Sequence, residues 1–285
     1  HFKGKSIIMN LKQFSEDLYK VFSEINSSEI AFHTDMIGLK FVQPRIMISQ
    51  QFDNLLNLLL KASNERTLLF PTFNYDFLKT GLYNVESDVC QVGAFNEHIR
   101  KLFSKQRTKT PVFNYCIINN KNFDFEIRDN PFSDNSIFDS MVKNKTTIGF
   151  LGADFSANTF IHYSEEVAGI GYRYHKLFHG FVNTHESKTN LTFKYRVRPT
   201  LEKAVDYDWK KIETDLGNSG LLHKANSDVC KMSYFRADKA HDFILSKIIN
   251  DELYLLTPAS KKIVLELYSK YGSPLLLDKI EKNEH

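Results

Sequence analysis

A histidine near the start of a predicted helix is the residue best placed to do chemistry in this chain. A predicted strand over 146–151 ends at Gly152, a polar loop follows, and a helix over 158–170 carries His162 in its first turns. Ligands of α/β proteins bind at the carboxyl ends of strands, and a helix N-terminus favours developing negative charge. An ordinary histidine titrates near neutrality, so His162 is a candidate general base. A capped helix with a purely structural histidine would give the same pattern.

Several catalytic and metal-binding motifs are absent from the sequence. There is no GxGxxG or GxxxxGK[ST] loop for a nucleotide, no HExxH metal site and no GxSxG nucleophile elbow. The three cysteines, Cys90, Cys116 and Cys230, form no CxxC pair. The odd number of cysteines and the absence of a CxxC pair argue against a disulfide framework and a zinc knuckle. We therefore expect reduced thiols, no metal and a cytoplasmic protein.

Helices and strands that would position His162 alternate along the first 170 residues. Apolar spacing predicts helices over 6–27, 49–63, 92–103, 132–142, 158–170, 209–218, 237–250 and 259–270. Short apolar runs predict strands over 29–33, 67–72 and 146–151, and alternation from His175 to Arg198 predicts antiparallel strands. This order predicts an α/β fold with a layered α/β/α core and a β-rich insertion in the C-terminal half. We expect one domain over 1–285, with the β-rich subdomain around 172–205 and a helical tail over 255–285.

Composition limits the function further. The chain has 285 residues, 42% of them hydrophobic and 25% charged, which is typical of a globular protein and not of a disordered one. Its apolar runs are too short for a membrane span. Lys and Arg number 37 against 34 Asp and Glu, so a net charge of +3 argues against a dedicated nucleic-acid binder. This charge does not exclude an anionic small molecule as ligand, and the sequence leaves a homodimer open.

The segment around His162 resembles the signature of the aminoglycoside 3-N-acetyltransferase family, a CoA-dependent group without the GNAT fold. The family pattern Thr-x-x-His-x-x-Glu is matched by Thr159, His162 and Glu165. Six further blocks resemble the family in order, namely Phe32–Gly38, Phe70–Phe73, Gly93–Arg100, Arg107–Asn114, Asn130–Phe138 and Asp206–Ile212. The sequence departs from the family at Thr110, where a histidine is usual, and at Asn114, where a serine is usual. The tail beyond about residue 255 is not covered.

The resemblance implies transfer of an acyl group, usually acetyl, from acyl-CoA to a primary amine without a metal. His162 would take the proton of the attacking amine. A carboxylate near the Asp-Tyr motif would orient the imidazole, and Asp208 or Asp206 is the candidate. The thioester oxyanion would be stabilised by the Thr159 hydroxyl or by backbone N–H groups near Gly152 and 158–159.

The resemblance also implies two sets of binding residues. Coenzyme A would contact two loops, a first loop around residues 33–36 and a basic loop around residues 105–110. The contacting residues would be His33, Thr34, Asp35, Met36, Arg107, Thr108, Lys109, Thr110 and Phe113. The acceptor would contact Tyr75, Asp76, Glu165 and Arg173. A solvated surface is the alternative for the basic loop.

The charge around the predicted acceptor site bears on the acceptor itself. The region 170–225 has no acidic cluster and carries the cations Arg173, Lys176, Lys194, Arg196 and Arg198. A polycationic drug would favour carboxylates, so this composition predicts an anionic acceptor, a nucleotide-linked aminosugar for surface polysaccharide synthesis. The alternatives are an aminoglycoside antibiotic acetyltransferase that confers resistance, a degenerate CoA-binding member without turnover, and a thioesterase-like hydrolase that uses His162 to activate water.

Overall fold

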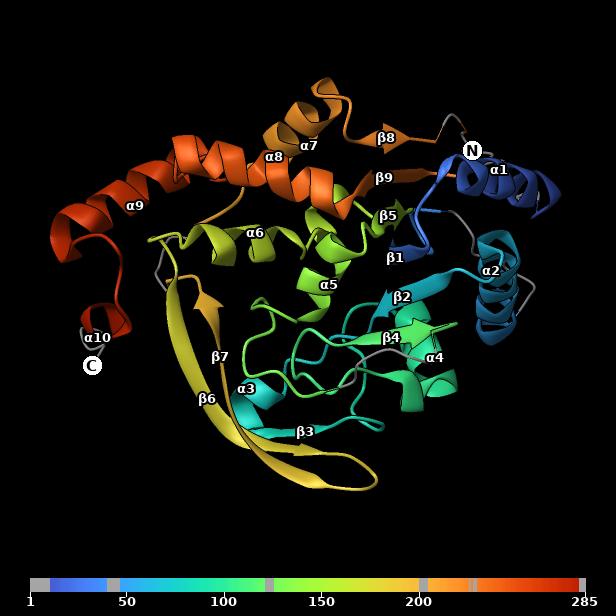
Figure 1. Cartoon of the computed structure of the whole chain (residues 1–285), viewed down its shortest axis with the longest axis horizontal. Coiled ribbons are helices and arrows are strands. Elements are labelled where there is room, and N and C mark those ends of the chain that lie inside the picture. Colours follow the sequence, from blue (N-terminus) through green and yellow to red (C-terminus); the bar gives the residue numbers. More distant parts are fainter. Residues whose placement is uncertain are drawn as a thin grey trace, which may run out of the picture.

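A six-stranded sheet lies at the centre of the protein (Figure 1). The computed structural model describes residues 11–39, 47–120, 126–199, 205–225, 227 and 230–281. The strands lie in the order β4 (Tyr115–Ile118), β2 (Thr67–Pro71), β1 (Glu29–Thr34), β5 (Thr147–Leu151), β9 (Met232–Arg236) and β8 (His223–Lys224). The central strands β2, β1 and β5 are parallel, and β4, β9 and β8 are each antiparallel to their neighbour. The carboxyl ends of the three parallel strands therefore meet at one edge.

Helices cover both faces of this sheet. Successive side chains of a strand point to opposite faces. Ile30 and Phe32 of β1 accordingly pack with α1 (Leu11–Glu24), α2 (Ile48–Ser63) and α4 (Ala94–Leu102), whereas Ala31 packs with the opposite layer. That layer contains α5 (Ile137–Lys143), α6 (Ile161–Ala168), α7 (Trp209–Asn218) and α8 (Ala237–Asn250). The predicted layered α/β/α core is confirmed.

A second sheet forms the long twisted ribbon at the lower left of Figure 1. Strands β6 (Tyr174–Asn183) and β7 (Lys188–Val197) are antiparallel along their whole length. A short strand from the first half of the chain, β3 (Leu82–Asn84), pairs in parallel with β6. The β-rich insertion is thus present, but it is completed by a strand that lies far away in the sequence. Residues 200–204 of the predicted subdomain lie outside the described residues.

The predicted starts of several helices differ from the structure or lie outside the described residues. The N-terminal helix is described from Leu11, and its predicted start at Ser6 lies outside the described residues. Helix α5 begins at Ile137, because Ser136 caps it by accepting a hydrogen bond from the Asp139 N–H. Helix α6 begins at Ile161, after a 3₁₀ turn over Phe155–Ala157.

The C-terminal tail is helical over α9 (Pro258–Tyr271) and α10 (Leu277–Ile280). No helix in the described part of the chain has the length and hydropathy that crossing a membrane would need.

Candidate active site

His162 and Glu165 form a hydrogen-bonded pair on α6. Residues three apart on a helix share one face, and Nδ1 of His162 lies 2.8 Å from Oε2 of Glu165. Glu165 is 1% exposed and accepts from three more donors. Its Oε1 accepts from Tyr172 at 2.6 Å and from Tyr207 at 2.7 Å, and its Oε2 accepts from Nη1 of Arg173 at 2.6 Å. A carboxylate with four donors is held firmly and in turn orients the imidazole.

The electrostatics of this pair leave the imidazole neutral. Burial raises the pKa of Glu165, but Arg173, His162 and Tyr172 outweigh burial and lower that pKa to about 2. Burial and the positive charge of Arg173 lower the pKa of His162, against the opposing effect of Glu165. At neutral pH a carboxylate therefore faces Nδ1 of an uncharged histidine.

His162 lines a cavity of about 660 Å³. Five aromatic rings contribute to its walls, those of Tyr75, Phe113, Tyr195, Tyr207 and Trp209. Thr159 and Arg173 lie beside the histidine on the same surface. None of the described lining residues is an Asp or a Glu. The volume falls within the range of small-molecule sites.

A second cavity of about 410 Å³ opens at the carboxyl ends of the parallel strands. It is lined by residues at the end of β1 and after β2 and β5, among them Thr34, Phe73 and Ala153. Tyr75, Ser156 and Thr159 line both cavities. A ligand in this second cavity can therefore extend past Thr159 toward His162.

The second cavity has unsatisfied polar atoms that fit the arm of coenzyme A. Oγ1 of Thr34 and Oδ1 of Asn96 are buried without a hydrogen-bond partner among the described residues, and both residues line this cavity. Buried polar atoms rarely lack a partner in a native structure, so their partner is expected to be a ligand. The pantetheine arm of coenzyme A carries two amides, whose N–H groups can donate to these oxygens. These two acceptor oxygens thus fit a CoA thioester, and we call this second cavity the CoA cavity.

Three of the four residues predicted on the first loop reach this cavity. His33, Thr34 and Asp35 line it, whereas Met36 is buried in the core beside α1 and α2. The His33 ring stacks on Phe150 at 5.1 Å, and burial lowers the pKa of His33 to about 4. A neutral His33 offers no charge to a phosphate, and the prediction for Met36 is wrong because its side chain points into the core.

Arg107 is a structural residue and does not reach the CoA cavity. The side chain is 1% exposed. Its guanidinium donates to Oδ1 of Asn114 at 2.8 Å and to the carbonyl oxygens of Val85 and Asp88 at 3.0 and 2.6 Å. These bonds join the loop before β4 to the loop after β3. The guanidinium therefore has no free edge for a diphosphate, in contrast to the prediction.

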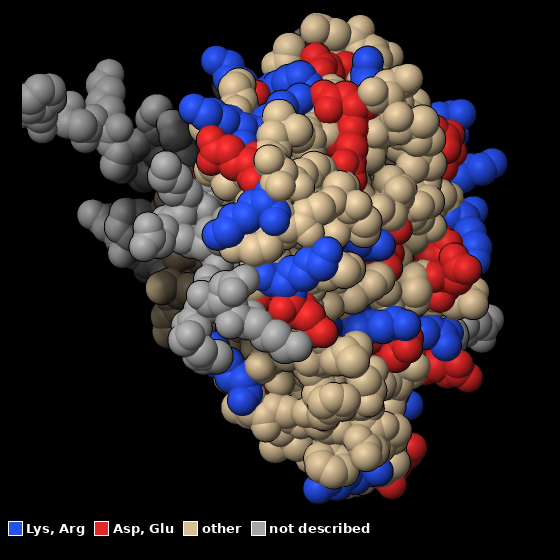
Figure 2. Space-filling model, turned by 90° about the vertical axis from the view of Figure 1, so that its left-hand side faces the viewer, with Lys and Arg blue, Asp and Glu red and all other residues tan. Residues whose placement is uncertain are grey.

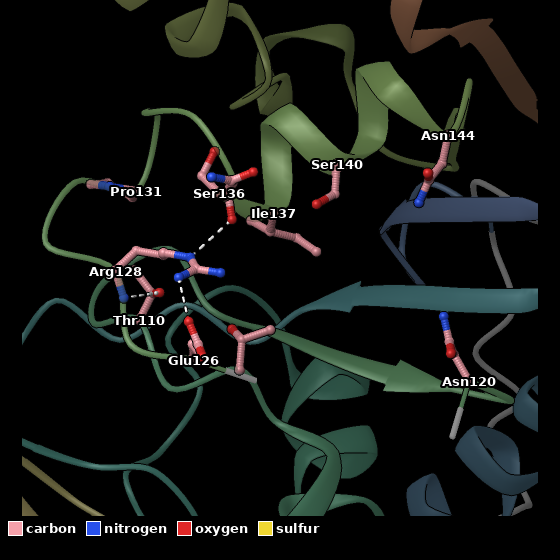
Figure 3. Close-up of a pocket in the computed structure, with 11 residues that line it drawn as sticks. Thr110, Asn120, Glu126, Arg128, Pro131, Ser136, Ile137, Ser140 and Asn144 are labelled. Atoms are coloured by element: carbon pink, nitrogen blue, oxygen red, sulfur yellow. Dashed lines mark hydrogen bonds and ion pairs between the residues drawn. The ribbon is translucent and has the colours of Figure 1, made fainter. Parts of the chain in front are cut away.

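Thr108 and Thr110 lie in a different cavity, of about 210 Å³, between β4 and α5 (Figure 3). Thr108 accepts from the Tyr115 N–H, and Thr110 accepts from the Arg128 N–H. Figure 3 shows Arg128 turned toward Glu126, its partner at 2.8 Å. This cavity shares no described lining residue with the two beside His162.

The basic-loop prediction for CoA is therefore not supported by these positions. Lys109 lines none of the three cavities, and Phe113 contributes to the wall of the cavity that holds His162.

The structure does not bring Asp208 to His162. Asp208 caps α7, where its carboxylate accepts from the Lys211 N–H at 3.1 Å. Asp206 lies 3.4 Å from Arg198. The orienting carboxylate is instead Glu165, which was predicted to bind the acceptor. The i, i+3 spacing of His162 and Glu165 on a predicted helix is the sequence signal that identifies this pair.

The Thr159 hydroxyl is a candidate donor to the oxyanion, whereas three nearby backbone N–H groups already have acceptors. The N–H of Gly152 donates to Lys231, that of Asn158 to Phe155, and that of Thr159 to Ala157. The Thr159 hydroxyl lies 3.5 Å from the Ala157 oxygen, at the limit of a hydrogen bond. The N–H groups of Gly152, Asn158 and Thr159 are thus already paired, and the Thr159 hydroxyl is the candidate that we retain.

The other predicted acceptor residues divide between site and scaffold. Tyr75 and Arg173 line the cavity with His162. Asp76 lines neither this cavity nor the second one; its carboxylate accepts from Gln91 and Asn74 and stabilises the turn into α3 (Phe77–Thr80).

The cations that suggested an anionic acceptor each lie beside a carboxylate. The pairs are Arg173 with Glu165 at 2.6 Å, Lys176 with Glu281 at 2.8 Å, Lys194 with Asp129 at 3.8 Å, Arg196 with Glu166 at 3.0 Å, and Arg198 with Asp206 at 3.4 Å. Figure 2 accordingly shows basic and acidic side chains interspersed over the face that it presents. Carboxylates from inside and outside this segment therefore balance a stretch that is basic in sequence.

Comparison with known proteins places this site in a family. The model of a protein family described as aminoglycoside 3-N-acetyltransferase matches residues 49–248, more than half of the chain. The chain belongs to this family. Its members are CoA-dependent N-acetyltransferases, so acetyl-CoA is the co-substrate. No group of three or more His, Cys, Asp or Glu side chains among the described residues is arranged to hold a metal ion.

Solved structures share the fold at low sequence identity. Aminoglycoside acetyltransferase AAC(3)-Xa is 14% identical with a TM-score of 0.63, over 86% of this chain and 96% of that one. AAC-IIIb in a binary complex with CoASH is 13% identical with a TM-score of 0.66, over 84% and 96%. The YokD protein from Bacillus subtilis is 14% identical with a TM-score of 0.62, over 85% and 94%. No curated protein shows significant sequence similarity to the chain.

Proposed function

We propose that this protein transfers an acetyl group from acetyl-CoA to a primary amine of an aminoglycoside-type aminosugar. The observation that carries the proposal is the place of His162, whose Nδ1 is held by Glu165 while its side chain lines the cavity joined to the CoA cavity. This arrangement leaves Nε2 for the substrate.

The reaction follows from this geometry. The neutral amine attacks the carbonyl carbon of the thioester, and a C–N bond forms while Nε2 of His162 takes the amine proton. The tetrahedral intermediate then collapses, the C–S bond breaks, and the CoA thiolate receives that proton from His162. General-base catalysis of this kind contributes about 10²–10⁴-fold. The ionised Glu165 stabilises the imidazolium that forms in between.

The intermediate places negative charge on the former carbonyl oxygen. The Thr159 hydroxyl lies where the two cavities join, and among the described residues its hydrogen-bond partner is the Ala157 oxygen at 3.5 Å. It can rotate to donate to the former carbonyl oxygen instead. One such donor is worth about 10²–10³-fold in kcat.

The cavity that His162 lines, here called the acceptor cavity, can hold an aminosugar. Its paired charges select little between acceptors of different net charge. Its aromatic walls can pack against the apolar faces of sugar rings. Structures of two family members are complexes with aminoglycosides, AAC-VIa with sisomicin and AAC(3)-IVa with apramycin. The nucleotide-linked aminosugar depended on the five cations of the 170–225 region, and each of these is paired with a carboxylate. The charges of this region therefore no longer favour a nucleotide-linked acceptor.

A test of the proposal measures CoA thiol release with acetyl-CoA and a panel of amines. We expect turnover with aminoglycosides, and a loss of about 10²–10⁴-fold in kcat for His162→Ala. His179→Ala is the matched control, because His179 lies exposed on β6 and contacts Thr192.

Three outcomes would contradict the proposal. Equal activity of His162→Ala and the unmodified protein would remove the catalytic assignment. Turnover with nucleotide-linked aminosugars alone would replace the acceptor. Thiol release without any amine would indicate a thioesterase-like hydrolase.

A further inference from the structure

Three polar atoms lie within hydrogen-bond distance of one guanidinium nitrogen beside His162. Nη1 of Arg173 is 2.6 Å from Oε2 of Glu165, 2.7 Å from Oη of Tyr207 and 2.8 Å from Nδ1 of His162. We infer that Arg173 and Tyr207 are positioning residues that hold His162 in the tautomer with its proton on Nδ1, so that Nε2 is the base. The inference rests on the proposed role of His162.

The number of hydrogens decides the tautomer. Nη1 carries two hydrogens and has three neighbours. Tyr207 donates its own hydrogen to Oε1 of Glu165 at 2.7 Å, so its oxygen is open to accept one hydrogen from Nη1. The second hydrogen goes to Oε2 of Glu165. None remains for Nδ1 of His162, which must therefore carry its own proton and donate it to Glu165.

The opposite tautomer would leave two acceptors in contact. If Nδ1 had no proton, its lone pair would face Oε2 of Glu165 at 2.8 Å with no hydrogen between them. Nη1 would then have to leave either Glu165 or Tyr207 to satisfy Nδ1. A buried acceptor left without a donor loses the hydrogen bond that it would make in water, so this tautomer is disfavoured.

Arg173 uses few of the hydrogen-bond donors of its guanidinium group. The side chain is 6% exposed, and its Nε is buried without a partner. Its side-chain hydrogen bonds to the described residues run through Nη1 alone. A buried guanidinium normally spreads its five hydrogens over several acceptors. Here a single nitrogen, Nη1, contacts both His162 and Glu165.

Charge also favours the neutral imidazole. The ionisable groups that face His162 are Glu165 on α6, Arg173 before β6, Arg198 after β7 and Tyr207 before α7, with the phenols of Tyr75 and Tyr195 across the cavity. Burial raises the pKa of all three phenols, which therefore stay neutral. Arg173 opposes protonation of His162, and Glu165 favours it. Removal of Arg173 thus moves the titration of His162 to higher pH.

The test combines ¹⁵N NMR of histidine-labelled protein with the pH profile of kcat/KM. In the unmodified protein we expect the chemical shifts of the Nδ1–H tautomer for His162. In Tyr207→Phe a hydrogen of Nη1 is released toward Nδ1, so the Nε2–H tautomer appears and kcat falls by about tenfold or more. Tyr172→Phe is the matched control, because the Tyr172 hydroxyl donates to the same Oε1 of Glu165 and, among the described residues, makes no hydrogen bond to Arg173 or His162.

Two substitutions of Arg173 separate its charge from its geometry. Arg173→Met removes the charge, and the acid limb of the kcat/KM profile should move up by about one pH unit. Arg173→Lys keeps the charge, so the limb should stay in place. Circular dichroism and CoA binding by calorimetry identify any variant that fails to fold, and the NMR of the unmodified protein keeps the inference testable in that case.

The inference fails if unmodified His162 shows the Nε2–H tautomer, or if Tyr207→Phe keeps the Nδ1–H tautomer as Tyr172→Phe does. It also fails if Arg173→Met leaves the acid limb where it was. The tautomer is measured without any acceptor or turnover. An inactive protein with the expected tautomer would therefore contradict the proposed function and leave the positioning role intact.

Discussion

Asn96 shows at the scale of one residue how the apo protein is prepared for its co-substrate. The side chain is 2% exposed on α4, and its amide nitrogen donates to the Val92 oxygen at 2.8 Å. Its carbonyl oxygen has no partner and belongs to a residue of the CoA cavity. An acceptor buried in this way costs free energy until a donor arrives, so ligand binding recovers what folding lost.

Replacement of Asn96 by leucine tests this role. Asn96→Leu removes the acceptor at similar volume, so KM for acetyl-CoA should rise about two- to tenfold, the value of one hydrogen bond, with kcat nearly unchanged. Steady-state kinetics with varied acetyl-CoA measures both constants. Asn250→Leu, at an exposed site on α8, is the matched control. An unchanged KM, or a loss confined to kcat, would show that Asn96 does not contact the co-substrate.

The residues whose neighbourhood the sequence indicates are those governed by local spacing. Thr159, His162 and Glu165 lie within seven positions, and the helix between them dictates which side chains share a face. Arg107 and Asp208 were misassigned because their partners are distant or lie on the backbone. Asn114 and the carbonyl groups of another loop surround Arg107, and the start of α7 uses Asp208 as its cap. Charge in the sequence does not indicate whether a side chain is already paired.

At the scale of elements, the loop after β5 fixes the junction of the two cavities. Gly152 has φ +72° at the end of β5, and a Cβ atom there would collide with the Asp35 oxygen and with Leu39. The loop after β1 therefore approaches the backbone of Gly152 closely. This contact joins the segments that carry Asp35 and Thr159, both of which line the CoA cavity.

Gly152→Ala should be far more destabilising than an alanine at a glycine with similar φ but open space. Gly169, at the end of α6, has φ +65° and no atom within 4 Å of an added Cβ. Gly169→Ala should cost about 1–2 kcal/mol, the penalty of the left-handed backbone alone. Gly152→Ala adds a steric clash with backbone, so we expect a further loss of about 1–3 kcal/mol. Chemical denaturation of both variants measures the difference, and equal losses would refute the close packing of these loops.

The alternation of helices and strands was predictable because each long element repeats its apolar residues at one period. The strands β3, β4, β8 and β9 were not predicted. β4 has four residues, all buried, and such a short apolar run lacks a period. β3 is three residues long and depends on β6, from the other half of the chain, for its pairing. Tertiary pairing, and not local propensity, defines these strands.

At the scale of the whole molecule, ion pairs distribute charge so that the acceptor cavity carries little net field. Arg173 and Arg198 line it, and the carboxylates of Glu165 and Asp206 lie beside them. The net charge is only +3, and both signs are interspersed on the face that Figure 2 shows. Long-range steering of a charged acceptor requires a field of one sign, and this protein does not build one at the cavity.

The rate with an aminoglycoside should therefore depend weakly on salt. With acetyl-CoA saturating, kcat/KM for the acceptor should change by less than about twofold between roughly 0.05 and 0.5 M salt, where the Debye length shrinks about threefold. Asp206→Asn leaves Arg198 without its carboxylate, so the polycation is repelled. In that variant kcat/KM should fall at low salt and recover at high salt. Asp251→Asn breaks a comparable exposed pair with Lys261 outside the cavity and is the control. A steep salt dependence of the unmodified protein, or none in Asp206→Asn, would mean that pairing does not set the charge of the cavity.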